Sequence, residues 1–152
     1  MSEHFVAGPV EAERGPFLAL TEEDWASMIR ELRAVFLGAR DYARERKGPG
    51  RIVFVSSAAA ARAIAGATLE GVAGAFLTTA ARVAAVELAE RGITANVVVP
   101  ALEPDRETIA AVTGFLLSDA ARGVSGAVVA ADGGFSITKE GTTSPLVDDA
   151  AP

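Results

Sequence analysis

The stretch AVELAERGITANVVVP, residues 85–100, contains the end of an expected helix and the whole of the strand expected after it. Its first part continues an apolar helix that we expect over residues 69–90, and Gly92 stands where a left-handed residue ends a helix. Residues 93–99 form a continuous apolar run that predicts a strand buried on both faces, and Pro100 closes it. A helix followed at once by a buried strand is typical of a parallel sheet covered by helices.

The same alternation extends over the rest of the chain. Thr21 is a typical N-cap before an amphipathic helix expected over residues 22–46, and Asp105 can cap a third helix. The predicted strands are residues 4–7, 51–56, 93–99 and 127–130. We therefore expect an α/β fold with three layers, in which a parallel sheet of about four strands carries helices on both faces.

Length and composition narrow the class of protein. The 152 residues suffice for one domain, which we expect over residues 1–138, with a flexible polar tail at 139–152. The net charge of −6 disfavours nucleic acid and anionic membranes as partners. The chain has no cysteine and one histidine, His4, so we expect no metal site and no thiol catalysis. Without an apolar run of 18 residues or a secretory signal, we expect a cytoplasmic protein that does not span a membrane.

Five blocks of the chain resemble, in order and spacing, the second half of the short-chain dehydrogenases/reductases, the family that includes ketoacyl reductases. The blocks are residues 16–25, 50–57, 85–100, 115–119 and 124–134. Together they cover most of the chain, from about residue 4 to 136. The resemblance implies a Rossmann-like fold that is truncated to the C-terminal half of the family's doubly wound sheet.

The resemblance also implies where the family's chemistry should lie. That family uses a tyrosine as general acid, a lysine four residues later that lowers the tyrosine pKa, and a serine thirteen residues before the tyrosine. Aligning through residues 85–89 places the serine at Ser57, the tyrosine position at Glu70 and the lysine position at Gly74. The serine is therefore retained, whereas the tyrosine and the lysine are replaced.

Other parts of the family's machinery are also missing. The glycine-rich cofactor loop has no counterpart, because residues 48–50 precede a strand instead of joining a strand to a helix. The family's catalytic asparagine falls at Glu31 or Leu32. The only tyrosine, Tyr42, lies off the apolar stripe of its helix, and we interpret it as a surface or interface aromatic. We expect no cofactor on the isolated chain, and NAD(P) only with a second chain.

The first hypothesis for function is a degenerate, non-catalytic partner or scaffold subunit. It would oligomerise through the two long helices at residues 22–46 and 69–90, either with itself or with a complete short-chain dehydrogenase. The resemblance implies an interface at these helices, because in the resembled family they form a four-helix bundle between subunits. The strand at residues 4–7 would also leave an open sheet edge. A variant with a partner chain is an NAD(P)-dependent oxidoreductase, which needs a second chain that supplies the cofactor half.

The second hypothesis is a repurposed enzyme that works without a cofactor. Ser57 and Glu70, with Asn96 or Glu103, would transfer protons on a carbonyl or hydroxyl small molecule, in a cleft at the carboxyl ends of the central strands. The simpler interpretation is that Ser57 bonds to the local backbone and that Glu70 favours a helix N-terminus. The sequence is therefore compatible both with an enzyme and with a non-catalytic protein.

Overall fold

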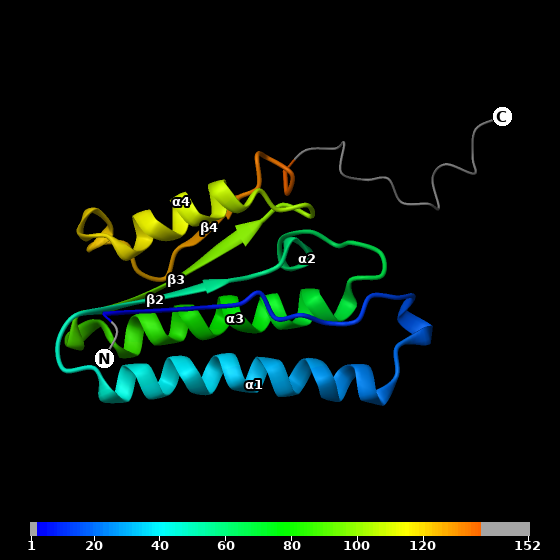
Figure 1. The fold of residues 1–152 in the computed structure, drawn as a ribbon, viewed down its shortest axis with the longest axis horizontal. Helices are drawn as coiled ribbons and strands as arrows, with labels where there is room; N and C mark the ends of the chain where they lie inside the picture. Colours follow the sequence, from blue (N-terminus) through cyan, green and yellow to red (C-terminus); the bar gives the residue numbers. More distant parts are fainter. Residues whose placement is uncertain (1–2, 138–152) are drawn as a thin grey trace.

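The computed structural model describes residues 3–137 (Figure 1). Four strands form one parallel sheet in the order β1-β2-β3-β4. The strands are β1 (His4–Ala7), β2 (Gly50–Val55), β3 (Ile93–Pro100) and β4 (Val128–Ala131). The number and the parallel direction of the strands confirm the predicted sheet. The predicted tail at 139–152 lies outside the described residues.

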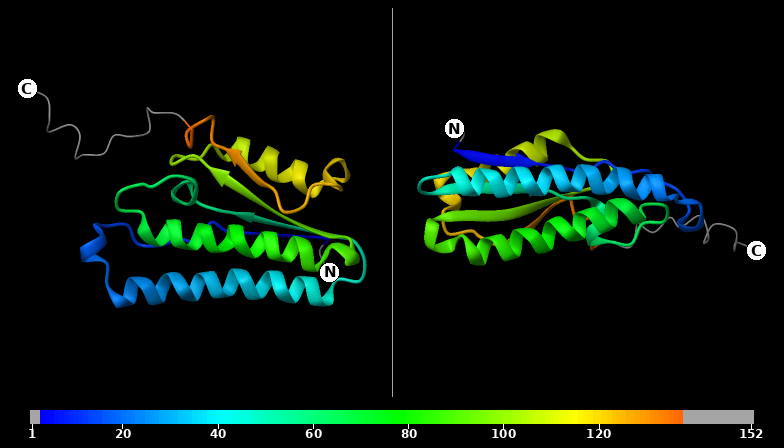
Figure 2. Two further views of the ribbon diagram at one scale, coloured as in Figure 1. Left: turned by 180° about the vertical axis from the view of Figure 1, so that it is seen from behind. Right: turned by 90° about the horizontal axis from the view of Figure 1, so that it is seen from below.

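Helices cover both faces of the sheet, which confirms the three-layer α/β architecture (Figures 1 and 2). The long helices α1 (Glu22–Glu45) and α3 (Thr68–Glu87) pack side by side on one face, and α4 (Arg106–Leu117) packs on the other. The short elements are α2 (Ala58–Ala61) and the 3₁₀ turns η1 (Phe17–Ala19), η2 (Ala89–Arg91) and η3 (Asp119–Ala121).

The helix ends follow from local sequence signals. Thr21 caps α1 in a capping box: its Oγ1 accepts a hydrogen bond from the Asp24 amide at 3.2 Å, and the Asp24 carboxylate accepts one from the Thr21 amide at 2.8 Å. Asp105 caps α4 by accepting hydrogen bonds from the next turn's amides. Gly92 ends η2 with φ 67°, a left-handed conformation that favours glycine. All three positions were expected from the sequence.

The core has two parts because successive side chains of a strand point to opposite faces. Ile52 and Phe54 of β2 face the long helices and belong to the larger cluster. Val53 of β2 and Val98 of β3 face α4 and pack on Leu116. The continuous apolar runs of the central strands thus pack against the helices on both faces of the sheet.

Tyr42 is buried, which makes its interpretation as a surface aromatic wrong. Only 9% of it is exposed, and its ring lies 5.9 Å from that of Phe5 in β1. Its hydroxyl donates to the Glu3 carbonyl at 2.6 Å and accepts from the Arg51 amide at 3.2 Å. Tyr42 therefore joins α1 to the starts of β1 and β2, a role that the apolar stripe of α1 alone does not show.

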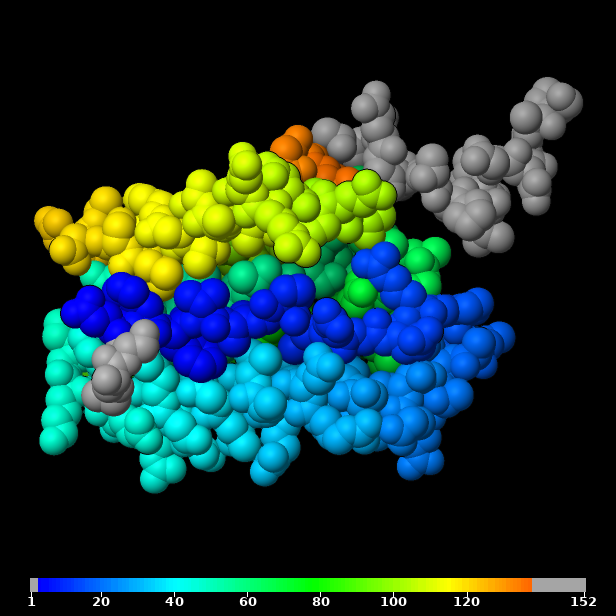
Figure 3. Space-filling model, viewed as in Figure 1, coloured from blue at the N-terminus to red at the C-terminus, as the bar shows by residue number. Residues whose placement is uncertain are grey.

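β1 forms one edge of the sheet and pairs only with β2 among the described residues. Figure 3 shows this strand and the segment after it at the surface, between α1 and α4. Phe5 points toward the long helices, where it contacts Tyr42 and Phe54. The edge position that the sequence predicts for residues 4–7 is confirmed.

By length and composition alone, α3 could cross a membrane, contrary to the expectation drawn from the missing apolar run. A core helix of a soluble protein meets the same criterion. In this fold one side of α3 packs along β2 and β3, with Leu77 and Ala81 fully buried. The large apolar residues on its other side, Val72, Phe76, Val83 and Val86, are exposed.

Candidate functional site

The carboxyl ends of β2 and β3 border a cavity of about 160 Å³. Ser57, at the end of β2, and Glu70, in the first turn of α3, both line it. In α/β sheets this edge is where ligands bind. The structure thus brings the two predicted site residues to one small cavity.

The hydroxyl of Ser57 is engaged by the backbone next to it. Its Oγ accepts a hydrogen bond from the Ala59 amide at 3.1 Å and caps the short helix α2. The neighbouring Ser56 is 1% exposed, lines the same cavity, and its Oγ has no hydrogen-bond partner among residues 3–137. Ser56 was not predicted as a site residue, because a serine at a strand end carries no distinguishing sequence pattern.

Glu70 is held by a two-pronged ion pair with Arg14. The Arg14 Nε and Nη2 atoms donate to the two carboxylate oxygens at 2.8 and 2.9 Å. The Glu70 side chain is 15% exposed, and the hydrogen bond to it raises the pKa of Arg14 above its usual value. Together with a hydrogen bond from the Gly15 amide to the Gly66 carbonyl at 2.9 Å, the pair fixes the segment after β1 against α3.

Gly74 leaves no room for a side chain. A Cβ atom there would lie 2.6 Å from the Ser56 Oγ, 2.7 Å from the Ala60 Cβ and 3.2 Å from the Ser57 amide nitrogen. The first two distances are shorter than real Cβ contacts, and the third is tighter than most of them. The end of β2 and helix α2 therefore occupy the space into which a longer residue at position 74 would extend.

The other suggested residues do not reach the cavity. Asn96 is fully buried in β3, where its Nδ2 donates to the Val124 carbonyl and its Oδ1 accepts from the Ala127 amide. It joins β3 to the segment before β4, so its suggested role in proton transfer was wrong. Glu103 is exposed and does not line the cavity. Among residues 3–137, no three His, Asp or Glu side chains gather to hold a metal ion.

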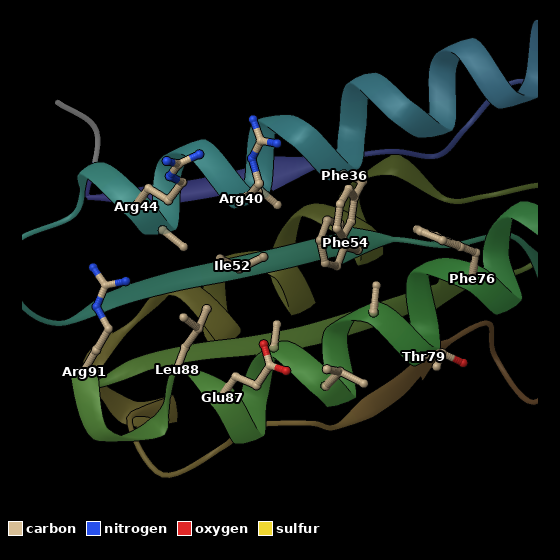
Figure 4. A pocket seen from close by; sticks show the side chains of 15 residues that line it. Phe36, Arg40, Arg44, Ile52, Phe54, Phe76, Thr79, Glu87, Leu88 and Arg91 are labelled. Atoms are coloured by element: carbon tan, nitrogen blue, oxygen red, sulfur yellow. The ribbon is translucent and has the colours of Figure 1, made fainter.

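A larger cavity, of about 490 Å³, lies between α1 and α3 over β2 (Figure 4). Ile52 and Phe54 line it from the strand, and Phe36 and Phe76 from the two helices. Its position was not predicted, because it depends on how the helices lie next to each other. The apolar character of residues 69–90 on nearly all sides was the only sequence signal for it.

The family model described as enoyl-(acyl carrier protein) reductase matches residues 4–104, about two thirds of the chain. The chain belongs to the short-chain dehydrogenase/reductase family. This confirms the resemblance that the five sequence blocks indicate. A comparison with curated protein sequences finds no match.

Solved structures of the family share the fold. A short-chain dehydrogenase/reductase from Serratia marcescens superimposes with a TM-score of 0.80 at 26% identity, covering 88% of this chain and 66% of that one. A blue fluorescent protein from a metagenomic library, in complex with NADPH, gives 0.79 at 28%, covering 88% and 64%. The landomycin C-6 ketoreductase with bound NADP and rabelomycin gives 0.82 at 24%, covering 90% and 62%. The chain spans less than two thirds of the length of each of these relatives.

The described residues of this short-chain dehydrogenase/reductase do not fit a nicotinamide cofactor in the family's manner. The tyrosine position holds Glu70, which is tied to Arg14, and the lysine position is Gly74, whose side-chain space is filled. None of the strand-to-helix connections in residues 3–137 contains the spacing G-x-G-x-x-G that lets the backbone approach a pyrophosphate.

Proposed function

We propose that this short-chain dehydrogenase/reductase relative is a non-catalytic partner or scaffold subunit that associates through α1 and α3. The main support for the proposal comes from the two positions where the family has its catalytic tyrosine and lysine. Glu70 forms an ion pair at the tyrosine position, and Gly74 is enclosed at the lysine position. Hydride transfer that depends on a tyrosine and a lysine has no groups to use at these two positions.

An exposed apolar surface supports the association. We call it the paired-helix face; it consists of Trp25, Ile29 and Phe36 of α1 with Val72, Phe76, Val83 and Val86 of α3. The Phe36 and Phe76 rings meet edge to face at 5.8 Å, so the two stripes form one continuous surface. A continuous apolar surface of this kind on a soluble protein is typical of an interface.

The charges at the ends of α1 favour a second copy of the same chain as the partner. Glu22 and Glu23 lie in the first turn of α1, whereas Arg40 and Arg44 lie toward its other end. A two-fold axis across the middle of the paired-helix face would set the acidic end of one copy against the arginines of the other. A complete relative is the alternative partner.

Light scattering on the full chain at micromolar concentration, combined with an NADPH titration, tests this proposal. We expect a dimer and no saturable NADPH binding. A monodisperse monomer would contradict the association, and saturable NADPH binding would contradict the non-catalytic assignment. Addition of a complete relative distinguishes a mixed assembly. NADPH binding by that mixture beyond the binding by the complete relative alone would favour the oxidoreductase that needs a second chain.

A second candidate function is the repurposed, cofactor-independent enzyme. The observation in its favour is that Ser57 and Glu70 line one cavity together with Ser56, whose hydroxyl has no hydrogen-bond partner within residues 3–137. Proton transfer on a carbonyl or hydroxyl compound would require Glu70 to leave Arg14. Equal turnover by the native chain and by Glu70→Gln would remove the role of this carboxylate.

A further inference from the structure

We propose that the cavity between α1 and α3 binds a medium-chain anionic amphiphile, such as a fatty carboxylate. The cavity has a volume of about 490 Å³, which falls in the range of sites for small molecules. Its lining is mostly carbon, from Phe36, Ile52, Phe54 and Phe76 together with the alanines of both helices. An apolar chain is the ligand that such a lining favours.

Positive charge gathers at one end of this cavity. Arg40 and Arg44 of α1 and Arg91 of η2 line it there, against a single acid, Glu87. Figure 4 shows Arg40 and Arg44 rising from α1 at the rim and Arg91 standing at the end of the gap between the helices. The chemistry of the cavity is therefore asymmetric, with apolar walls and a cationic rim.

Two of these arginines keep donors for an anion. The side chain of Arg44 makes no hydrogen bond or ion pair with any residue in the range 3–137. Arg91 donates one N–H to the Arg46 carbonyl at 2.8 Å, which closes the end of the gap and leaves its other donors available. Arg40 is paired with Asp41 and contributes less. A carboxylate head held by Arg44 and Arg91 would form charge-assisted hydrogen bonds.

The spacing of the two ends sets the length of the ligand. Phe36 and Arg44 lie eight residues apart on α1, which corresponds to about 12 Å along the helix axis. The tail would end against the Phe36 and Phe76 rings, which line the apolar part of the cavity, and the head would lie at the arginines. Each methylene that enters the apolar part strengthens binding by roughly a factor of four.

The ligand would occupy part of the paired-helix face, so it would compete with the second copy that the proposed function places there. Through this link, binding of the amphiphile would regulate the association of the two copies. Only the link rests on the proposed function, because the binding itself depends on the cavity and its arginines.

Calorimetric titration of the full chain with decanoate tests the inference. We expect saturable binding of one decanoate per chain, and roughly fifteenfold weaker binding of octanoate, which has two methylenes fewer. We expect at least tenfold weaker binding of decanol, which lacks the charge. The absence of saturable binding up to millimolar decanoate would overturn the proposal. Equal affinity for decanoate and decanol would overturn it as well.

Three variants locate the site. Arg44→Gln should weaken decanoate binding several-fold, whereas Arg33→Gln, on an exposed part of the same helix and outside the cavity lining, should leave it unchanged. Ala80→Leu should abolish binding by filling the cavity. Circular dichroism checks that each variant folds. Unchanged affinity in folded Arg44→Gln and Ala80→Leu would overturn the assignment.

Light scattering with and without decanoate separates this inference from the proposed function. A dimer that gives no decanoate heat overturns the inference and leaves the association standing. A monomer that binds decanoate supports the inference and contradicts the association. A dimer that decanoate converts to monomer supports both.

Discussion

Gly74 of α3 lies directly against Ser56 at the end of β2, so close that a Cβ atom on Gly74 would be 2.6 Å from the Ser56 hydroxyl. The Ala60 Cβ lies 2.7 Å from the same point and cannot rotate away. We therefore expect Gly74→Ala to destabilise the fold by about 1–3 kcal/mol, because overpacking outweighs the better helix propensity of alanine. Urea unfolding followed by circular dichroism measures this loss.

Gly114 of α4 is the matched control for this substitution. It is also a helical glycine, but apart from its chain neighbours and the backbone of its own helix, no atom of the described residues lies within 4 Å of the Cβ it would gain. Gly114→Ala should stabilise the fold by roughly 0.5–1 kcal/mol through helix propensity alone. Similar effects of the two substitutions would show that Gly74 is not enclosed.

Tyr42→Phe should cost about 1–3 kcal/mol, because it leaves a buried backbone donor without a partner. The Tyr42 hydroxyl accepts from the Arg51 amide and donates to the Glu3 carbonyl, and the ring itself would remain in place. Chemical denaturation of the variant measures the loss. A free energy of unfolding equal to that of the native chain would mean that water replaces the hydroxyl.

Glu70→Gln should lower the free energy of unfolding by about 0.5–1 kcal/mol, since a two-pronged pair with one partly buried partner exceeds the usual surface ion pair. Glu23→Gln is its control, because Glu23 and Arg30 form a single contact at 2.8 Å with both side chains exposed. We expect that control to change stability little. If both variants lose the same free energy of unfolding, the Arg14–Glu70 pair stabilises the fold no more than an exposed ion pair does.

Phe76→Glu should convert the proposed dimer to monomer by placing a charge in the middle of the paired-helix face. Phe115→Glu introduces the same change at a half-exposed phenylalanine of α4, on the opposite side of the sheet, and should leave association unchanged. Light scattering reads both outcomes. A dimer that tolerates Phe76→Glu but not Phe115→Glu would move the interface to the other face.

Acid should destabilise the fold through the helix caps. Hydrogen bonds from Thr21 lower the pKa of Asp24, and hydrogen bonds from Thr108 and the Glu107 amide lower that of Asp105. A carboxyl with a lowered pKa contributes stability that is present above its unfolded pKa, about 3.9, and lost as the pH falls through its folded value.

The melting temperature should therefore stay level near neutral pH and fall at acidic pH, as measured by thermal scans. Asp105→Asn should lower the melting temperature at neutral pH and make it less dependent on acid. An acid dependence that is the same in Asp105→Asn as in the native chain would show that this cap does not contribute to it.

The sequence predicts the fold well because its signals are local. Thr21 with Asp24 marks the start of α1 within three residues, and Gly92 marks a helix end by its own conformational preference. The continuous apolar run at β3 needs no knowledge of its neighbours to indicate a buried strand. Such features depend on a few adjacent residues, so they can be predicted without knowledge of the tertiary contacts.

The site is less predictable because its decisive contacts are not local. Arg14 and Glu70 are 56 residues apart, and no spacing rule relates the two positions. Asn96 is a polar residue near the expected cleft in sequence, but the pleat of β3 turns its side chain toward the segment before β4. Tyr42 was misjudged for the same reason, since its partners come from β1 and β2.

The packing of Ala60 against position 74 imposes an order on any effort to install a reductase active site in this scaffold. A lysine at position 74 would meet the Ala60 Cβ before its amine could reach solvent or substrate. Ala60 and the Ser56 side chain would have to make room before lysine could be introduced, and Glu70 would have to give up Arg14 before a tyrosine could follow. A designer would therefore open the contact between α2 and α3 first and introduce the catalytic residues afterwards.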